Sequence, residues 1–242
     1  MKLTARSLFL GALVVAATAT CVRLGFWQLA RMHQKHTIHA AQRALLARPP
    51  LELDRALPAT TPETGSRVRL RGRWEASVVV LLSGRTHLGA AGVSLVSAVR
   101  LGSGEQVLVE RGWIEADDAR TAHPERATDS LADAIGVVRP LARSPRPTPW
   151  AELASERPGT RLWSARALDA DSAAARFGPP LATWMVQELP ESPRRAGDPI
   201  PEEYVVPDET MHLSYAIQWF GFAAIIGLGS LALALRRVPD RS

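Results

Sequence analysis

The stretch Met211–Leu235, MHLSYAIQWFGFAAIIGLGSLALAL, decides the class of this protein. It contains no aspartate, glutamate, lysine or arginine, and Arg236 and Arg237 follow it directly. A helix needs about 20 mainly apolar residues to cross the hydrocarbon core of a bilayer. We therefore predict that this stretch crosses a membrane, with some tilt because it is longer than the minimum.

The charges on the two sides of this stretch predict its orientation. The segment Glu202–Glu209 in front of it is acidic, whereas the tail after it is basic. The basic flank of a membrane span usually stays in the cytoplasm. The C-terminal tail, residues 236–242, is accordingly predicted to be cytoplasmic.

A second apolar run lies near the N-terminus. It extends over Ser7–Val22 and continues past Arg23 to Leu29. Arg23 can reach the membrane interface with its guanidinium group while its methylene groups stay in the apolar layer. A cleaved signal peptide is the alternative, because the start is basic and Ala17-Thr18-Ala19 resembles a cleavage site. The length of the run favours a transmembrane helix over 7–29.

Two spans place both ends of the chain on the same side of the membrane. The boundaries that follow are a first transmembrane helix at 7–29, an extracytoplasmic domain at 30–210, a second transmembrane helix at 211–235 and a cytoplasmic tail at 236–242. We expect a multi-pass protein of the bacterial inner (plasma) membrane, in contact with the lipid bilayer and with both termini in the cytoplasm.

The composition excludes several classes of protein. Hydrophobic residues make up 46% and charged residues 22% of the chain, so it is not disordered as a whole. A single cysteine, Cys21, excludes a disulfide framework and any site with several cysteine ligands. The net charge of +5 comes from the basic residues around the two apolar runs. A nucleic-acid partner is therefore not predicted.

The region between the spans is predicted to be a small antiparallel-rich α+β domain. Residues 67–74 alternate arginine with apolar side chains and glycine, a pattern typical of a half-buried strand. Further strands are predicted at 78–82, 93–100, 106–111, 135–141 and 182–189, with a hairpin at Gly102-Ser103-Gly104. Helices are predicted at 31–47 and 165–177, loops at 51–66 and 144–158, and a tether at 191–207.

No catalytic constellation is visible, because the chain has no Gly-x-Ser-x-Gly, no His-Glu-x-x-His and no P-loop. An enzyme is therefore not predicted. The arginines within 67–73 could bind phosphate, but such a row is more often the solvated face of a strand. His33, His36 and His39 could bind a metal, but no carboxylate or cysteine joins them, and a hydrophilic helix next to the membrane explains them better.

His212 is the most informative polar residue, because it lies at the outer end of the second span. Tyr215, Ala216 and Trp219 are placed near its side of a helix by their spacing. An ionisable residue at this depth could bind a heme iron or a heme propionate. The alternative is an interfacial histidine that anchors the span together with the two aromatic residues, and these observations leave both open.

Four sequence elements, in this order along the chain, resemble the Surfeit locus protein 1 family of cytochrome c oxidase assembly factors. They read LGFWQLAR at 24–31, VRLRGRW at 68–74, VLVERGWI at 107–114 and HLSYAIQWF at 212–220. Each element is modest alone, but the set is specific because it extends over nearly the whole chain. The two-span topology is similar to that of the family as well.

The resemblance implies a helper, not an enzyme, that binds heme a and assists its insertion into or retention by subunit one of the oxidase, together with other assembly factors. It implies that His212 is a ligand of the heme iron and that Tyr215 and Trp219 line the site. Trp27 and Arg31 would shape the facing side, where the guanidinium of Arg31 can pair with a propionate.

Two other functions stay open at this stage. The outer domain could act as an interaction scaffold that holds oxidase subunits without binding heme. A two-span envelope sensor is the second alternative, and a mainly helical outer domain would favour it.

Overall fold

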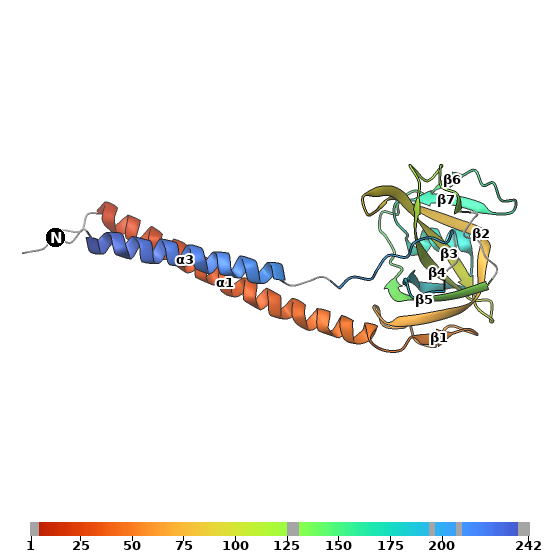
Figure 1. Ribbon diagram of the computed structural model, residues 1–242, viewed down its shortest axis with the longest axis horizontal. Coiled ribbons are helices and arrows are strands. Elements are labelled where there is room, and N and C mark those ends of the chain that lie inside the picture. Colours follow the sequence, from red (N-terminus) through yellow and green to blue (C-terminus); the bar gives the residue numbers. More distant parts are fainter. Residues whose placement is uncertain (1–4, 125–130, 194–196, 207–209, 237–242) are drawn as a thin grey trace, which may run out of the picture. The chain divides into compact units, whose positions relative to one another are not determined.

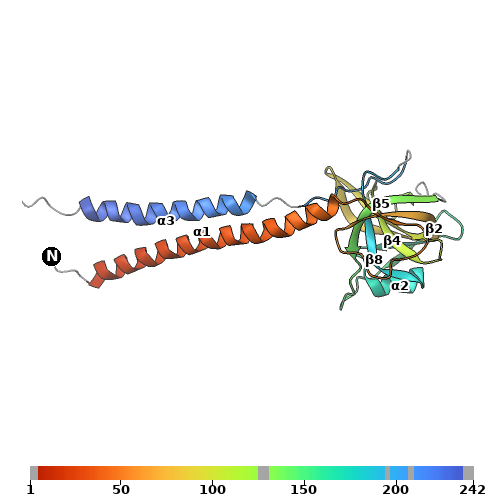
Figure 2. The same ribbon diagram turned by 90° about the horizontal axis from the view of Figure 1, so that it is seen from below.

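The computed structural model describes residues 5–124, 131–193, 197–206 and 210–236. The chain divides into two compact units (Figures 1 and 2). One unit contains the two long helices, and the other, Gln42–Val205, contains the strands. This confirms the predicted fold class, a membrane protein in which two apolar helices flank a small α+β domain.

The long helices α1 (Ala5–Leu46) and α3 (Thr210–Arg236) are both apolar and long enough to cross a membrane. Helix α1 includes the predicted span and continues without a break through the polar segment after it. At 1.5 Å per residue, 42 residues extend over about 63 Å, roughly twice the thickness of a hydrocarbon core. Some of α1 therefore lies outside the apolar layer, and the helix ends shortly before Pro49-Pro50.

In the described residues eight strands form one sheet. They are β1 (Leu51–Leu53), β2 (Arg67–His87), β3 (Ala90–Arg100), β4 (Gln106–Glu115), β5 (Leu131–Pro140), β6 (Ala151–Leu153), β7 (Arg161–Ala165) and β8 (Leu181–Glu188). Strands β2, β3, β4, β8 and β5 pair in this order, and β5 pairs with β2 again, so these strands form a closed ring. Most of the pairings are antiparallel, as predicted, but β1–β2, β2–β7 and β4–β8 are parallel.

Strand β2 joins the two strands predicted at 67–74 and 78–82. Its beginning, Arg67–Arg73, pairs with β5, and its middle, Val78–Leu82, pairs with β7. The pairing with β3 is irregular between Glu75 and Val80. The sequence predicts two strands over this region, whereas the chain forms one.

The core of the domain lies on both sides of this sheet. Val68 and Leu70 are fully buried, so the apolar half of the predicted alternation does face the core. Gly72 continues the same alternation, and a Cβ atom there would overlap the backbone carbonyl oxygen of Arg100 on β3. A glycine is needed at this position because β2 and β3 approach closely.

The short helix α2 (Ala170–Phe177) covers a portion of this core. Asp169 caps its N-terminus, since its carboxylate accepts a hydrogen bond of 2.8 Å from the backbone N–H of Ser172. Ala173 and Phe177 are buried against the sheet. The helix starts later than the predicted residue 165, because that residue ends strand β7.

The hairpin predicted at Gly102-Ser103-Gly104 is confirmed, since Arg100 on β3 pairs with Gln106 on β4. The loop predictions at 51–66 and 144–158 are partly wrong, because β1 and β6 lie within them. Each of these strands has three residues, which is too short for an alternating pattern to be read from the sequence.

Candidate functional site

A hydrogen bond between His212 and Gln28 links the two long helices. The Nδ1 atom of His212 lies 2.9 Å from the Oε1 atom of Gln28. Both side chains are partly buried, and both belong to the unit that contains the apolar helices. A neutral amide of α1 therefore holds the imidazole that the sequence singles out on α3.

This contact decides which nitrogen of His212 is available for binding. A neutral imidazole carries one N–H group and one lone pair. With the carbonyl oxygen of Gln28 as the acceptor, a neutral ring carries its hydrogen on Nδ1 and its lone pair on Nε2. Within the described residues Nε2 forms no hydrogen bond. The ring can thus donate its Nε2 lone pair to a metal without losing its contact to α1.

Close packing of α1 and α3 surrounds this pair. Gly25 lies against Phe220, and a Cβ atom on Gly25 would come within 2.6–2.9 Å of the phenyl ring carbons. Phe26 meets the same ring edge-on at a centroid distance of 5.3 Å. Ala216 is only 1% exposed. Small residues thus let the two helix backbones approach, as is common between membrane helices.

The aromatic residues predicted beside His212 lie on the same helix. Tyr215 is 46% exposed, whereas Trp219 is partly buried and contacts Phe222 edge-on at a centroid distance of 5.9 Å. Tyr215 precedes the buried Ala216 directly, and Trp219 follows Ala216 by three residues, so both lie beside the side of α3 on which Ala216 is buried. Their role toward a ligand stays a prediction.

The two residues predicted on the facing helix are not brought to His212. Trp27 is 57% exposed, and Arg31 donates a hydrogen bond of 2.8 Å to the side-chain oxygen of Gln34 on its own helix. Over the ranges that the structure describes, neither residue forms a hydrogen bond or ring contact with His212. Their proposed contribution, aromatic surface and a positive charge, stays a prediction.

A family model decides the identity of the chain. The model of the SURF1 family matches residues 15–224, which include most of both long helices and the whole domain between them. The chain belongs to the SURF1 family. This is the Surfeit locus protein 1 family indicated by the four sequence elements, and its members are known in general as assembly factors of cytochrome oxidase.

Two SURF1-like proteins illustrate the relationship. The SURF1-like protein of Rickettsia bellii (strain RML369-C) is 24% identical over 207 residues, which cover 84% of this chain and 81% of the relative. The SURF1-like protein of Rickettsia felis (strain ATCC VR-1525 / URRWXCal2) is 28% identical over 138 residues, which cover 54% of this chain and 58% of the relative.

Gln28 is the site residue that reasoning from the sequence misses. It belongs to the first SURF1-like element, but only the aromatic and charged residues of that element, Trp27 and Arg31, attract attention in the sequence. The available signal is its position, because an amide close to an apolar helical stretch needs a hydrogen-bond partner. Its partner lies 184 residues away, so no local pattern could identify it.

The SURF1-like element at 107–114 belongs to the domain core. The side chain of Arg111 is 6% exposed, and its guanidinium carbon lies 4.2 Å from the centroid of the Trp74 ring. It also forms ion pairs of 3.8 Å with Glu188 and 3.4 Å with Asp198. Burial lowers the pKa of Arg111, and the two carboxylates oppose this effect. Arg111 of this element therefore makes its ring contact and its ion pairs within the strand domain.

The same element binds the segment that follows Asp198. The backbone N–H of Trp113 donates to the carbonyl oxygen of Ile200 at 2.7 Å, and the N–H of Ile200 donates back at 2.8 Å. Gly112, directly before Trp113, has a φ of +125°, a conformation that residues with a side chain disfavour. The predicted tether at 191–207 is thus fastened to β4 at this point.

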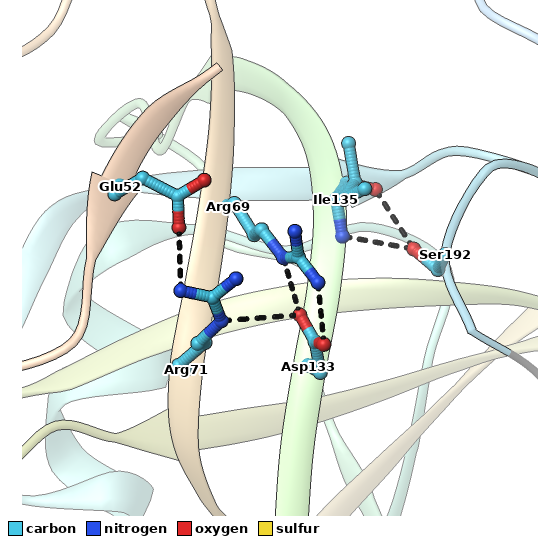
Figure 3. Close-up of polar contacts among 6 residues, drawn as sticks. All are labelled: Glu52, Arg69, Arg71, Asp133, Ile135 and Ser192. Atoms are coloured by element: carbon cyan, nitrogen blue, oxygen red, sulfur yellow. Dashed lines mark hydrogen bonds and ion pairs between the residues drawn. The ribbon is translucent and has the colours of Figure 1, made fainter.

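Two arginines of the row on β2, Arg69 and Arg71, pair with carboxylates of neighbouring strands (Figure 3). Arg69 donates two hydrogen bonds of 2.7 Å to Asp133 on β5, and Arg71 forms an ion pair of 3.0 Å with Glu52 on β1. The hydrogen bonds from Arg69 lower the pKa of the Asp133 carboxyl group. These ion pairs join three strands. They therefore favour the interpretation of the arginines as the solvated face of a strand, not as a phosphate-binding site.

The three histidines of α1 do not share one environment. His33 and His36 are exposed, whereas His39 is 6% exposed. Among the described residues, no group of three histidine, cysteine or acidic side chains converges as metal ligands would. The metal hypothesis for these histidines therefore receives no support.

Proposed function

We propose that this SURF1-family protein binds heme a and assists its insertion into or retention by subunit one of cytochrome c oxidase, together with other assembly factors. The observation that carries the proposal is the 2.9 Å contact of His212 Nδ1 with Gln28 Oε1. In the tautomer that donates to this oxygen, Nε2 keeps its electron pair for a metal. An imidazole nitrogen is a common axial ligand of heme iron. The heme is cargo in this proposal, not a resident catalytic group.

The surroundings of His212 suit such a cargo. A heme is a flat apolar ring with two anionic propionates, so it needs apolar contacts and a positive charge. Tyr215 and Trp219 offer aromatic surface next to His212 on α3. Arg31, three residues after Gln28 on α1, is exposed, and it would exchange its hydrogen bond to Gln34 for one to a propionate.

We further propose that the membrane is the bacterial inner membrane, with both termini in the cytoplasm and the strand domain outside. The support is the charge asymmetry of α3, with an acidic segment before it and arginines after it. In this orientation His212 lies at the outer end of its span.

The heme content of a His212→Ala variant tests the proposal. Wild type, His212→Ala and the control His33→Ala are purified from cells that make heme a, and heme per protein is measured spectroscopically. We expect His212→Ala to lose most of its heme, because the iron loses its ligand, and His33→Ala, an exposed residue of α1, to keep it. An unchanged heme spectrum in His212→Ala would show that His212 is not a ligand of the heme iron.

Oxidase activity separates this function from its alternatives. Deletion of the gene is expected to lower oxidase activity and the heme a content of the membranes, and normal oxidase would contradict an assembly role. Full rescue by a His212→Ala protein that lacks heme would favour the scaffold function. The domain is rich in strands, so the helical outer domain that would favour an envelope sensor is not found.

A further inference from the structure

We propose that Gln28 is a positioning residue that fixes the ring of His212 and presents its Nε2 atom to iron. The inference rests on the proposed heme binding and assigns a specific role to a second side chain. Its basis is the 2.9 Å contact between Nδ1 of His212 and Oε1 of Gln28.

The packing of the helices restrains this contact. Gly25, three residues before Gln28, lies against Phe220, and Ala216, four residues after His212, is 1% exposed. Residues three or four positions apart share one face of a helix. Gln28 and His212 therefore lie on the faces by which α1 and α3 meet, and the close approach at Gly25 sets their separation.

The direction of the hydrogen bond decides whether His212 can bind a metal. An acceptor at Nδ1 keeps the hydrogen there and leaves the lone pair on Nε2. If the amide N–H of Gln28 faced Nδ1 instead, the hydrogen would lie on Nε2 and block binding. Partners of this kind also orient the ring and increase its basicity, and their loss typically weakens metal binding about 10–100-fold.

A glutamine suits this position better than a carboxylate does. An ionised side chain is costly near the apolar layer, whereas an amide is neutral and still offers a carbonyl oxygen. A glutamate at position 28 would attract the Nδ1 hydrogen more strongly and make the ring a stronger electron donor. A stronger donor stabilises ferric iron relative to ferrous iron, so the reduction potential of a bound heme would become more negative.

The experiment titrates hemin into the full-length, heme-free protein in detergent, then measures the reduction potential of the complex. We expect Gln28→Leu, which removes the acceptor at similar size, to bind hemin about 10–100-fold more weakly than wild type. Gln28→Glu should bind hemin with a more negative potential. The control Gln218→Leu changes an exposed glutamine of α3 and should match wild type in both measurements.

The outcomes separate this inference from the proposed function. If both Gln28 variants match wild type in affinity and potential while His212→Ala loses hemin, the role of Gln28 is overturned and heme binding by His212 stands. If His212→Ala also binds hemin like wild type, both fail. Circular dichroism checks folding, and if Gln28→Leu misfolds, the potential of Gln28→Glu decides alone.

Discussion

Gly112 stands between a buried arginine and a tryptophan, and its backbone explains why a side chain does not fit there. Its φ is +125°, and a Cβ atom would overlap the carbonyl oxygen of Ile200. That oxygen accepts the hydrogen bond of Trp113, so a side chain at 112 would push away the segment that the bond holds. The glycine of this SURF1-like element thus allows the backbone of Ile200 to pack closely against β4.

The substitution Gly112→Ala is expected to destabilise the protein more than Gly104→Ala. Both glycines have a positive φ, +125° and +92°, which costs a residue with a Cβ about 1–2 kcal/mol. Position 104 has open space around it, so only position 112 adds a steric clash. Each kcal/mol lowers the melting temperature of a chain of this size by about 2–4 °C.

The measurement is the thermal midpoint of the full-length protein in detergent, followed by tryptophan fluorescence. Equal midpoints for Gly112→Ala and Gly104→Ala would show that the contact with Ile200 adds nothing to the cost of the backbone conformation.

The residues of the candidate site differ in whether they could be predicted from the sequence. His212 could be singled out, because an ionisable residue at the end of an apolar stretch needs an explanation. Gln28 could not, because a neutral amide carries no charge signal and its partner lies on another helix. The exposed positions of Trp27 and Arg31 likewise depend on how α1 is rotated toward α3, which the sequence does not encode locally.

At the scale of elements, strand β2 shows both the strength and the limit of reading periodicity. Along Arg67–Arg73 the apolar face is buried and the other face carries arginines, so alternation is visible. In the middle of the strand, Val78 and Val80 pack into one core cluster while Val79 and Leu81 pack into another. With both faces buried the alternation disappears, so the continuity of the whole strand could not be predicted.

The contact of α1 with α3 is expected to depend on Gly25. In Gly25→Ala the new methyl group would meet the Phe220 ring at 2.6–2.9 Å, so the helices must separate or the ring must move. Overpacking of this kind costs about 1–3 kcal/mol. Because Gln28 lies one turn away, the His212 contact should lengthen as well, and heme content should fall together with the melting temperature.

The matched control is Gly221→Ala, which changes a glycine of α3 with no neighbouring atom within 4 Å. It should leave heme content at the wild-type value and should not lower the melting temperature, because alanine has the higher helix propensity. A Gly25→Ala protein with wild-type heme content would mean that the helix separation does not govern the site.

At the scale of the whole molecule, the four SURF1-like elements divide between the two units. The first and last lie in α1 and α3, where Gln28 meets His212. The second and third lie in the strand domain, where Gly72 and Gly112 allow close backbone approaches. The candidate heme chemistry therefore belongs to the helices, and the domain elements maintain the fold.

The closed ring of strands could not be predicted from the sequence. The sequence indicates which segments are strands, but ring closure depends on β5 pairing with both β2 and β8, and β4 pairing with β8. These contacts join segments far apart in the chain, and no local pattern encodes them.

The orientation in the membrane can be tested with single cysteines in a Cys21→Ser background, because Cys21 is the only natural cysteine. Leu88→Cys places a thiol on a residue that is 96% exposed in the strand domain, and Arg6→Cys places one on an exposed position near the start of α1. With the domain outside and both termini inside, a membrane-impermeant maleimide should label Leu88→Cys in intact spheroplasts and Arg6→Cys only after permeabilisation. The Cys21→Ser parent should stay unlabelled throughout. The opposite labelling would reverse the orientation and place His212 at the cytoplasmic end of α3.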